Sequence, residues 1–248
     1  LARAYMWENK LDSAYIYANE VVESVDNGDY KFSWVHTTAA TATNLVDRDL
    51  IYGSEHIFRM GINKMDDQGK NYFTATAKGN GSLLTPSETM RDQIYEVSAK
   101  GYGIDWRYNY GYIYDGDTYP YMAKYRQVEN GAYNNMIPLI RISEMYYTCA
   151  EAKAASDKAR ACEVLNTVRN ARNLTEAYNL DPTALSTQDI KDEIWKEYRK
   201  ELLGEGQLFY YYKRLNYTSI PGAAGSAGRS VYVLPYPDNE VEFGNRKQ

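Results

Sequence analysis

Residues 139–156 read LIRISEMYYTCAEAKAAS, and this stretch decides the fold. Its apolar residues recur at spacings of three and four, so they share one face of a helix: Ile142, Tyr146 and Cys149. Ser156 and Asp157 can then turn the chain and cap a second helix. That helix carries a matching stripe, made of Ala161, Leu165 and Val168. The pattern predicts an antiparallel helical hairpin.

Two other parts of the chain show the same helical period. Residues 1–24 place small residues and tyrosines on one face around a polar turn at residues 8–10, which predicts another hairpin. Ser186 and Asp189 predict a capping box for a later helix, whose apolar stripe is Ile190, Ile194, Tyr198 and Leu202. Recurring hairpins bury their faces against neighbouring hairpins. We therefore expect a mainly α fold of tetratricopeptide-like antiparallel helix pairs.

Residues 26–135 are irregular by comparison. Asp66-Asp67-Gln68-Gly69 and Gly79-Asn80-Gly81-Ser82 are typical of loops, and a short strand is expected around Ile57 and Phe58. We expect a single domain over residues 1–248, in which residues 26–135 form a long, loop-rich insertion with a few short strands.

One helix is predicted inside this insertion. Thr85 and Glu88 have the spacing of a capping box, with Pro86 at the first helical position. An apolar stripe follows and ends before Gly101: Met90, Ile94 and Val97. Near the other end of the chain, the glycine- and alanine-rich residues 221–228 predict a flexible loop.

Composition excludes several classes of protein. The 248 residues are 44% hydrophobic, which is enough to bury a sizeable core. The formal charge of -5 leaves no basic surface for nucleic acid, so no nucleic-acid partner is expected. No stretch approaches the roughly 18 apolar residues that would argue for a membrane-spanning helix. These features predict a soluble, globular protein.

The sequence offers no evident metal or cofactor site. Cys149 and Cys162 are too few for a disulfide framework and lack further ligands for zinc. We favour two small buried residues, although a bridge stays open if their Cα atoms lie within about 7 Å. His36 and His56 have no neighbouring ligand pattern either. We therefore expect no metal and no cofactor.

Catalytic motifs are equally sparse. Glycosidases need two carboxylates about 5 to 10 Å apart, but 33 acidic residues make chance pairs such as Asp115 and Asp117 inevitable. No phosphate-binding loop, serine elbow or metalloprotease helix occurs. We expect no enzymatic activity, and a glycosidase is the least favoured of the alternatives.

Tyrosine is unusually abundant, with 26 residues against 5 phenylalanines. It gathers in residues 102–125, where four tyrosines alternate with other residues and would share one side of an extended chain. A sugar stacked on one ring buries about 80 Å² and gains about 2 kcal/mol. The candidate ligand-binding residues are therefore Trp106, Tyr108, Tyr110, Tyr112 and Tyr114, with Trp34 as a second position. The alternative is that these rings pack the insertion against the helices.

Several of these motifs, in this order, resemble the SusD/RagB family of outer-membrane lipoproteins. They are PLIRISEMYYTCAEAKA with LNTVRNAR, the hairpin of residues 1–24, LLTPSETM with Asp105 and Arg107 downstream, IKDEIWKEYRKELLGEGQLFYYYKRLN, and LPYPDNEV near the end. Two positions depart from the family. An arginine and then an aspartate commonly follow the Glu-Gly pair, whereas Leu208 and Tyr211 follow Glu205-Gly206 here. The ion pair of those two residues is therefore expected to be absent.

The resemblance implies a function. Family members bind oligosaccharides through loops on a scaffold of helix pairs, at the outer face of the outer membrane. They hand the glycan to a SusC-like TonB-dependent transporter and are held to the membrane only by a lipidated cysteine. Members are longer than this chain, so we expect a fragment whose anchor lies upstream, and neither Cys149 nor Cys162 takes that role. The alternative is a helical-repeat module that binds a protein instead of a sugar.

Overall fold

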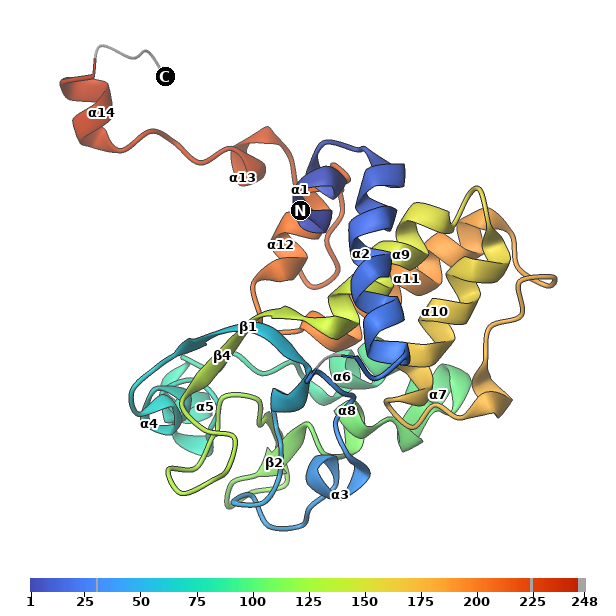
Figure 1. Ribbon diagram of the computed structural model, residues 1–248. Helices are drawn as coiled ribbons and strands as arrows, with labels where there is room; N and C mark the ends of the chain where they lie inside the picture. Colours follow the sequence, from blue (N-terminus) through green and yellow to red (C-terminus); the bar gives the residue numbers. More distant parts are fainter. Residues whose placement is uncertain (30, 224, 245–248) are drawn as a thin grey trace. The chain divides into compact units, whose positions relative to one another are not determined.

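The structure is a computed structural model that describes residues 1–29, 31–223 and 225–244 (Figure 1). The chain divides into two compact units, residues 1–205 and residues 206–248. The single domain expected over residues 1–248 stays a prediction. The expected mainly α class is confirmed, with short strands confined to two small sheets among the described residues.

A layer of packed helices, here called the helical layer, forms one part of the first unit. Its members are α1 (Ala2–Trp7), α2 (Leu11–Asp26), α9 (Ile142–Lys153), α10 (Lys158–Asn170) and α11 (Thr187–Leu202), with the short turn η3 (Glu176–Tyr178) before α11. Helix α9 packs against α2 on one side and α10 on the other, and it also contacts α11 (Figure 1). Ten of its twelve residues are buried, as expected for a helix enclosed by others. Both predicted hairpins are therefore present.

Small side chains allow these helices to approach closely. Ala14, Ala18 and Val22 of α2 are fully buried, as is Ala150 of α9. Cys149 and Cys162 are also buried, and both are free thiols. Burial raises the pKa of the Cys149 thiol to about 12, so this residue packs as a small neutral group.

Helix α11 begins with the predicted capping box. The Ser186 hydroxyl accepts a hydrogen bond from the Asp189 backbone N–H at 3.1 Å, and the Asp189 carboxylate accepts one from the Ser186 N–H at 2.8 Å. Two orphan backbone donors are satisfied in this way. Ile190 and Ile194 of the predicted stripe are fully buried.

The insertion contains more regular structure than expected. Its elements are α3 (Thr37–Ala40), η1 (Gly53–Glu55), β1 (His56–Gly61), α4 (Met65–Lys70), α5 (Ala75–Asn80), α6 (Glu88–Tyr95), α7 (Val97–Lys100), η2 (Tyr102–Ile104), α8 (Trp106–Asn109), β2 (Tyr112–Tyr114) and β3 (Pro120–Met122). Residues 66–69, expected as a loop, lie within α4, and Gly79 and Asn80 end α5. Both helices are single short turns that depend on tertiary contacts, which a local composition cannot reveal.

The predicted strand around Ile57 and Phe58 is confirmed as β1, which pairs antiparallel with β4 (Met136–Arg141). Residues 139–141, expected at the start of a helix, belong to this strand, and α9 begins at Ile142. Phe58 lies opposite Ile140 and Met60 opposite Ile137. This pairing, between residues about eighty positions apart, overrides the local helical period.

The helix predicted from Thr85 to Gly101 was wrong in two details. Ser87 is the cap of α6, since its hydroxyl accepts from the Met90 N–H at 3.2 Å, whereas the Thr85 hydroxyl accepts from the Met122 N–H at 3.1 Å. The helix is also interrupted at Glu96, which has a φ of +54°. The Glu96 carboxylate binds Lys200 of α11 at 2.7 Å. A buried ion pair thus coincides with the strained residue.

The second unit consists of α12 (Gln207–Arg214), α13 (Arg229–Tyr232) and α14 (Asp238–Glu242). Leu208 and Tyr211 both lie on α12, where neither side chain can form the family's usual ion pair. The predicted loop of residues 221–228 includes Ala224, which lies outside the described residues. A β-bridge between Ser219 and Ser226 joins its two sides.

Within the described parts of both units, none of the helices has the length and apolar character needed to cross a membrane. Their histidine, cysteine, aspartate and glutamate side chains form no group of three or more that could hold a metal ion.

Candidate functional site

Residues 102–125, here called the aromatic segment, begin with a capped turn of helix. The Asp105 carboxylate accepts the Arg107 N–H at 2.8 Å and so caps α8. The Trp106 N–H donates to the Arg172 carbonyl at 3.0 Å, which ties the start of α8 to the end of α10. The helical layer thereby fixes where the aromatic segment begins.

Gly111 allows the chain to pass from α8 into a hairpin. A Cβ atom at this position would lie 2.3 Å from the Arg107 carbonyl oxygen, so only glycine fits. Strand β2 then pairs with β3, with Tyr112 opposite Met122 and Tyr114 opposite Pro120. The tyrosines therefore lie on a helical turn and a short hairpin. The expectation that Tyr108 to Tyr114 line one side of an extended chain was wrong, because α8 interrupts the strand period.

Two of the predicted site residues belong to hydrophobic clusters. Trp106 is 9% exposed and packs with Val35 and Ala40. Tyr112 is 4% exposed and packs with Tyr95 and other residues of a larger cluster. Both rings hold the insertion together, which was the alternative interpretation of the tyrosine pattern.

Tyr108 and Tyr110 are half-buried, and each has an arginine over its ring. The Arg91 guanidinium lies 3.9 Å from the Tyr108 ring centroid and 4.3 Å from that of Tyr112. The Arg48 guanidinium lies 5.6 Å from the centroid of Tyr110. These distances are those of cation–π contacts.

Tyr114 is the exposed member of the group, at 65%. It ends β2 beside a loop that is fastened at several points. The Asp117 carboxylate accepts the Tyr121 hydroxyl at 2.8 Å and pairs with Lys78 of α5 at 3.5 Å. The Tyr119 hydroxyl donates to the Pro86 carbonyl at 3.0 Å. Tyr114 is thus an open aromatic ring on a hairpin whose loop is held in place.

Trp34, the second predicted position, lies against the helical layer. Its half-buried ring is 4.9 Å from the Tyr146 ring of α9, and the Arg172 guanidinium is 5.3 Å from its centroid. Trp34 therefore contacts the helical layer, whereas Tyr114 lies on the β2–β3 hairpin. Whether any of the six predicted residues binds a ligand stays a prediction.

Behind the aromatic segment lies a buried cluster of charges centred on Glu201 of α11. Its carboxylate pairs with Arg107 at 3.0 Å, Arg141 at 2.6 Å and Arg172 at 2.6 Å. The side chains of these four residues are 5% exposed or less. Three arginines from α8, β4 and the end of α10 therefore converge on one acid.

The cluster continues through Glu197, which pairs with Arg107 and Arg169 and with Lys200 on its own helix. Among the described residues, the ion pairs of this network join seven cationic and seven acidic side chains: Arg107, Lys124, Arg141, Arg169, Arg172, Lys196 and Lys200 with Glu55, Glu96, Asp105, Glu193, Glu197, Glu201 and Glu205. Its formal charges cancel.

The network keeps Glu197 and Glu201 ionised. Burial alone would raise the pKa of Glu197 and Glu201, but the adjacent cations outweigh it and hold both pKa values below the ordinary value. Arg107 and Lys200 act on Glu197, while Arg172 and Arg141 act on Glu201. Carboxylates of this kind bind cations firmly and are poor proton donors near neutral pH.

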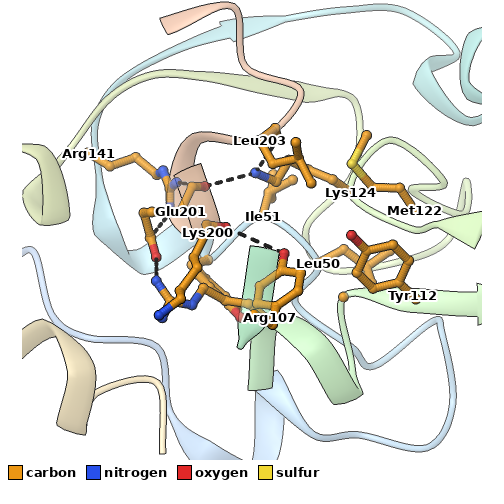
Figure 2. Close-up of a pocket in the computed structure, with 13 residues that line it drawn as sticks. Leu50, Ile51, Arg107, Tyr112, Met122, Lys124, Arg141, Lys200, Glu201 and Leu203 are labelled. Atoms are coloured by element: carbon orange, nitrogen blue, oxygen red, sulfur yellow. Dashed lines mark hydrogen bonds and ion pairs between the residues drawn. The ribbon is translucent and has the colours of Figure 1, made fainter. Parts of the chain in front are cut away.

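A pocket of about 410 Å³, including its open side, lies between the network and the aromatic segment (Figure 2). Lys124, Glu201 and Tyr112 contribute polar groups to its wall, and Leu50, Ile51, Met122 and Leu203 contribute apolar ones. The Lys124 ammonium donates to the Glu201 carbonyl, the Leu203 carbonyl and the Glu205 carboxylate, so all of its protons are used. The Tyr112 hydroxyl points towards the pocket in Figure 2 and interacts with the Tyr95 hydroxyl. The pocket therefore offers little free hydrogen-bonding capacity to a sugar.

One feature of the sequence indicates the ion network, although the apolar stripe of the same helix is more evident. Glu193, Glu197, Glu201 and Glu205 recur every four residues, which places them along one face of α11 and its C-terminal extension. Arg48 and Arg91 had no comparable signal, because their position over tyrosine rings depends on how distant segments pack.

The sequence matches the family model described as the SusD family over residues 2–233. No curated protein matches the chain in sequence. Solved structures with the same fold include a SusD superfamily protein from Bacteroides vulgatus, with 19% identity, a TM-score of 0.69, and coverage of 100% of this chain and 56% of that one. A SusD superfamily protein from Bacteroides fragilis has 21% identity, a TM-score of 0.67, and coverage of 97% and 53%.

Surface glycan-binding protein A from Bacteroides thetaiotaomicron, in complex with laminarihexaose, has 18% identity, a TM-score of 0.64, and coverage of 97% and 60%. The chain thus spans little more than half of the length of these structures. Because the family model covers nearly all of the sequence, this chain belongs to the SusD family.

Proposed function

We propose that this chain captures oligosaccharides at the cell surface through the aromatic segment. Its family membership supports carbohydrate binding, as does its likeness in fold to a protein whose structure contains laminarihexaose. The observation that carries the proposal is Tyr114, an exposed ring on a hairpin whose loop is anchored to α5 and to the residues before α6.

The physical argument rests on the C–H face of a sugar ring. One stacked ring gains about 2 kcal/mol by the area that it buries, and much of this is lost to the entropy of binding. A rigid platform loses less, because no loop has to be ordered when the sugar binds. We propose that Tyr114 makes the main contact and that Tyr108 and Tyr110 add to it. Trp106 and Tyr112 would then hold the platform in position, and Trp34 would remain a separate position against the helical layer.

The remaining parts of the proposal follow the family. The full protein would be held to the outer face of the outer membrane by a lipidated cysteine outside this chain. It would deliver glycan to a SusC-like TonB-dependent transporter and carry out no catalysis. Co-purification with such a transporter tests the partnership. Release of reducing ends from a bound polysaccharide, lost on changing one carboxylate, would contradict the absence of catalysis.

Binding to a glycan array, followed by calorimetry on the best ligand, tests the central proposal. Tyr114→Ala should weaken binding about tenfold, because stacking on one aromatic ring is lost. Its folding should be unchanged, since the ring is largely exposed. Trp7→Ala is a suitable control, because Trp7 is also an exposed aromatic residue, at 43%, but lies on α1 in the helical layer. Equal affinity of wild type and Tyr114→Ala for the ligand would refute this site.

A further inference from the structure

Arg91 of α6 is buried in an unusual setting. It is 8% exposed, and its guanidinium lies between the rings of Tyr108 and Tyr112. Nη2 donates a hydrogen bond to the Tyr108 carbonyl at 2.7 Å. The two rings hold the guanidinium plane in place and leave its edge as the direction in which further hydrogen bonds can form.

The side chain has unused donors. Nε is buried and has no partner among the described residues, and Nη1 makes no hydrogen bond to them either, although it is not buried. Five described arginines are buried, and four of them pair with glutamate: Arg107, Arg141, Arg169 and Arg172. No described carboxylate lies within ion-pair distance of Arg91. A buried cation without a counter-charge is costly, so one is expected from outside the chain.

Arg48 repeats the pattern on the neighbouring ring. Its guanidinium lies over Tyr110 and donates to three backbone carbonyls, those of Ala42, Thr43 and Tyr110. Carbonyl oxygens orient the cation but do not neutralise it. The half-buried tyrosines of the aromatic segment are therefore bordered by two arginines that no described acid compensates.

We propose that Arg91 binds an anionic group on the glycan, so that the protein takes acidic oligosaccharides. The proposal rests on the proposed function, since the sugar rings would stack on the tyrosines of the same segment. A carboxylate or sulfate oxygen can accept a hydrogen bond from Nη1, the unbonded donor of Arg91 that is not buried, and such charge-assisted hydrogen bonds are about twice as strong as neutral ones. Arg48 adds long-range attraction. The recognised chemistry is a planar or tetrahedral oxyanion next to a ring that can stack.

Matched pairs of ligands test this, by calorimetry on the whole protein. One arm compares hexagalacturonate with its methyl ester, which removes the carboxylate charge. The other compares a κ-carrageenan hexasaccharide with the same hexasaccharide after desulfation, which removes the sulfate charge. The proposal predicts about tenfold or greater preference for the charged member of one pair, and the arm that shows it identifies the anion. The preference should shrink as NaCl is raised, because an anion at the edge of the site is screened.

Arg91→Gln should abolish the preference and its salt dependence, and Arg91→Lys should restore part of both, because it keeps the charge but loses the fork. A merely structural role would lower the affinity for both members of a pair alike. Should Arg91→Gln fail to fold, Arg48→Gln, which lies nearer the surface, must reduce the preference. Equal binding of charged and neutral members by the wild type overturns this inference but leaves the proposed function standing. Binding of no glycan at all overturns the proposed function and this inference with it.

Discussion

The ion network and the aromatic segment both bury arginine, yet only the network supplies the counter-charge. Around Glu201, seven cations meet seven acids, and the strongest contacts are 2.6 Å long. Around Tyr108 and Tyr110, Arg91 and Arg48 meet aromatic faces and carbonyl oxygens instead. The two regions share Arg107 of α8, which belongs to the network while the next residue, Tyr108, contacts Arg91.

The difference separates a region that holds the fold from one that is available to a ligand. In the balanced, buried network, each described cation has an acidic partner. Arg91, which lies beside half-buried rings, has no described acidic partner, and under the proposal a ligand supplies it. The ion network also holds α8 in place through Arg107, and α8 in turn positions Tyr108 beside Arg91.

The largest effect should follow removal of the central charge of the network. Glu201→Gln leaves three arginines facing a neutral amide, and we expect it to lower the free energy of unfolding by about 3–5 kcal/mol. Chemical denaturation followed by circular dichroism measures this. Glu163→Gln is the matched control, because Glu163 pairs with Arg160 at 2.9 Å on the surface and should contribute less than about 1 kcal/mol. Equal effects of the two substitutions would remove the distinction between a buried network and ordinary surface pairs.

The second-largest effect should be a loss of stability at low pH. The folded-state pKa values of Glu197 and Glu201 are lower than the ordinary value of 4.5. The unfolded chain therefore binds protons first as the pH falls, so the stability that these acids contribute is complete above about pH 5 and is lost progressively below 4.5. Unfolding free energies measured from pH 7 to pH 3 should show this decline, with a smaller slope in Glu201→Gln. A variant with an unchanged slope would contradict the ionised state of Glu201.

The smallest effect should come from the uncompensated arginine. Arg91→Gln removes two cation–π contacts but also removes a buried charge that no described acid pairs with, so we expect a loss of no more than about 1–2 kcal/mol. Thermal denaturation without ligand measures it. A loss as large as that of Glu201→Gln would mean that Arg91 is a structural residue of the same kind as those in the network.

The sequence was sufficient to predict the helical layer. Long apolar stripes, such as Ile190 and Ile194 on α11, and a local capping box at Ser186 carry their information within a few residues. The structure of the insertion was harder to predict from the sequence. Residues 139–141 end strand β4 and do not start a helix, because they pair with β1, which lies about eighty residues away in the sequence. Ser87 caps α6 in place of Thr85, because the Thr85 hydroxyl binds the Met122 N–H of β3.

For the candidate site, the sequence identified the right segment but not its geometry. Alternating tyrosines suggested one extended stretch, whereas Tyr108 lies on the turn of α8 and Tyr112 and Tyr114 lie on the hairpin that follows Gly111. Tyr112 and Tyr114 lie on the same side of β2, but only Tyr112 belongs to the hydrophobic cluster around Tyr95, so Tyr112 is buried while Tyr114 is exposed. Arg48 and Arg91 come from separate elements, so their meeting with the tyrosines follows only from the folded chain.

A crystal structure of the protein with the oligosaccharide that it binds most tightly tests the central claim most directly. The account predicts a sugar ring stacked on Tyr114 and an acidic group of the ligand within about 3 Å of Arg91 Nη1. A ligand bound only in the helical layer, with Tyr114 and Arg91 both untouched, would contradict it.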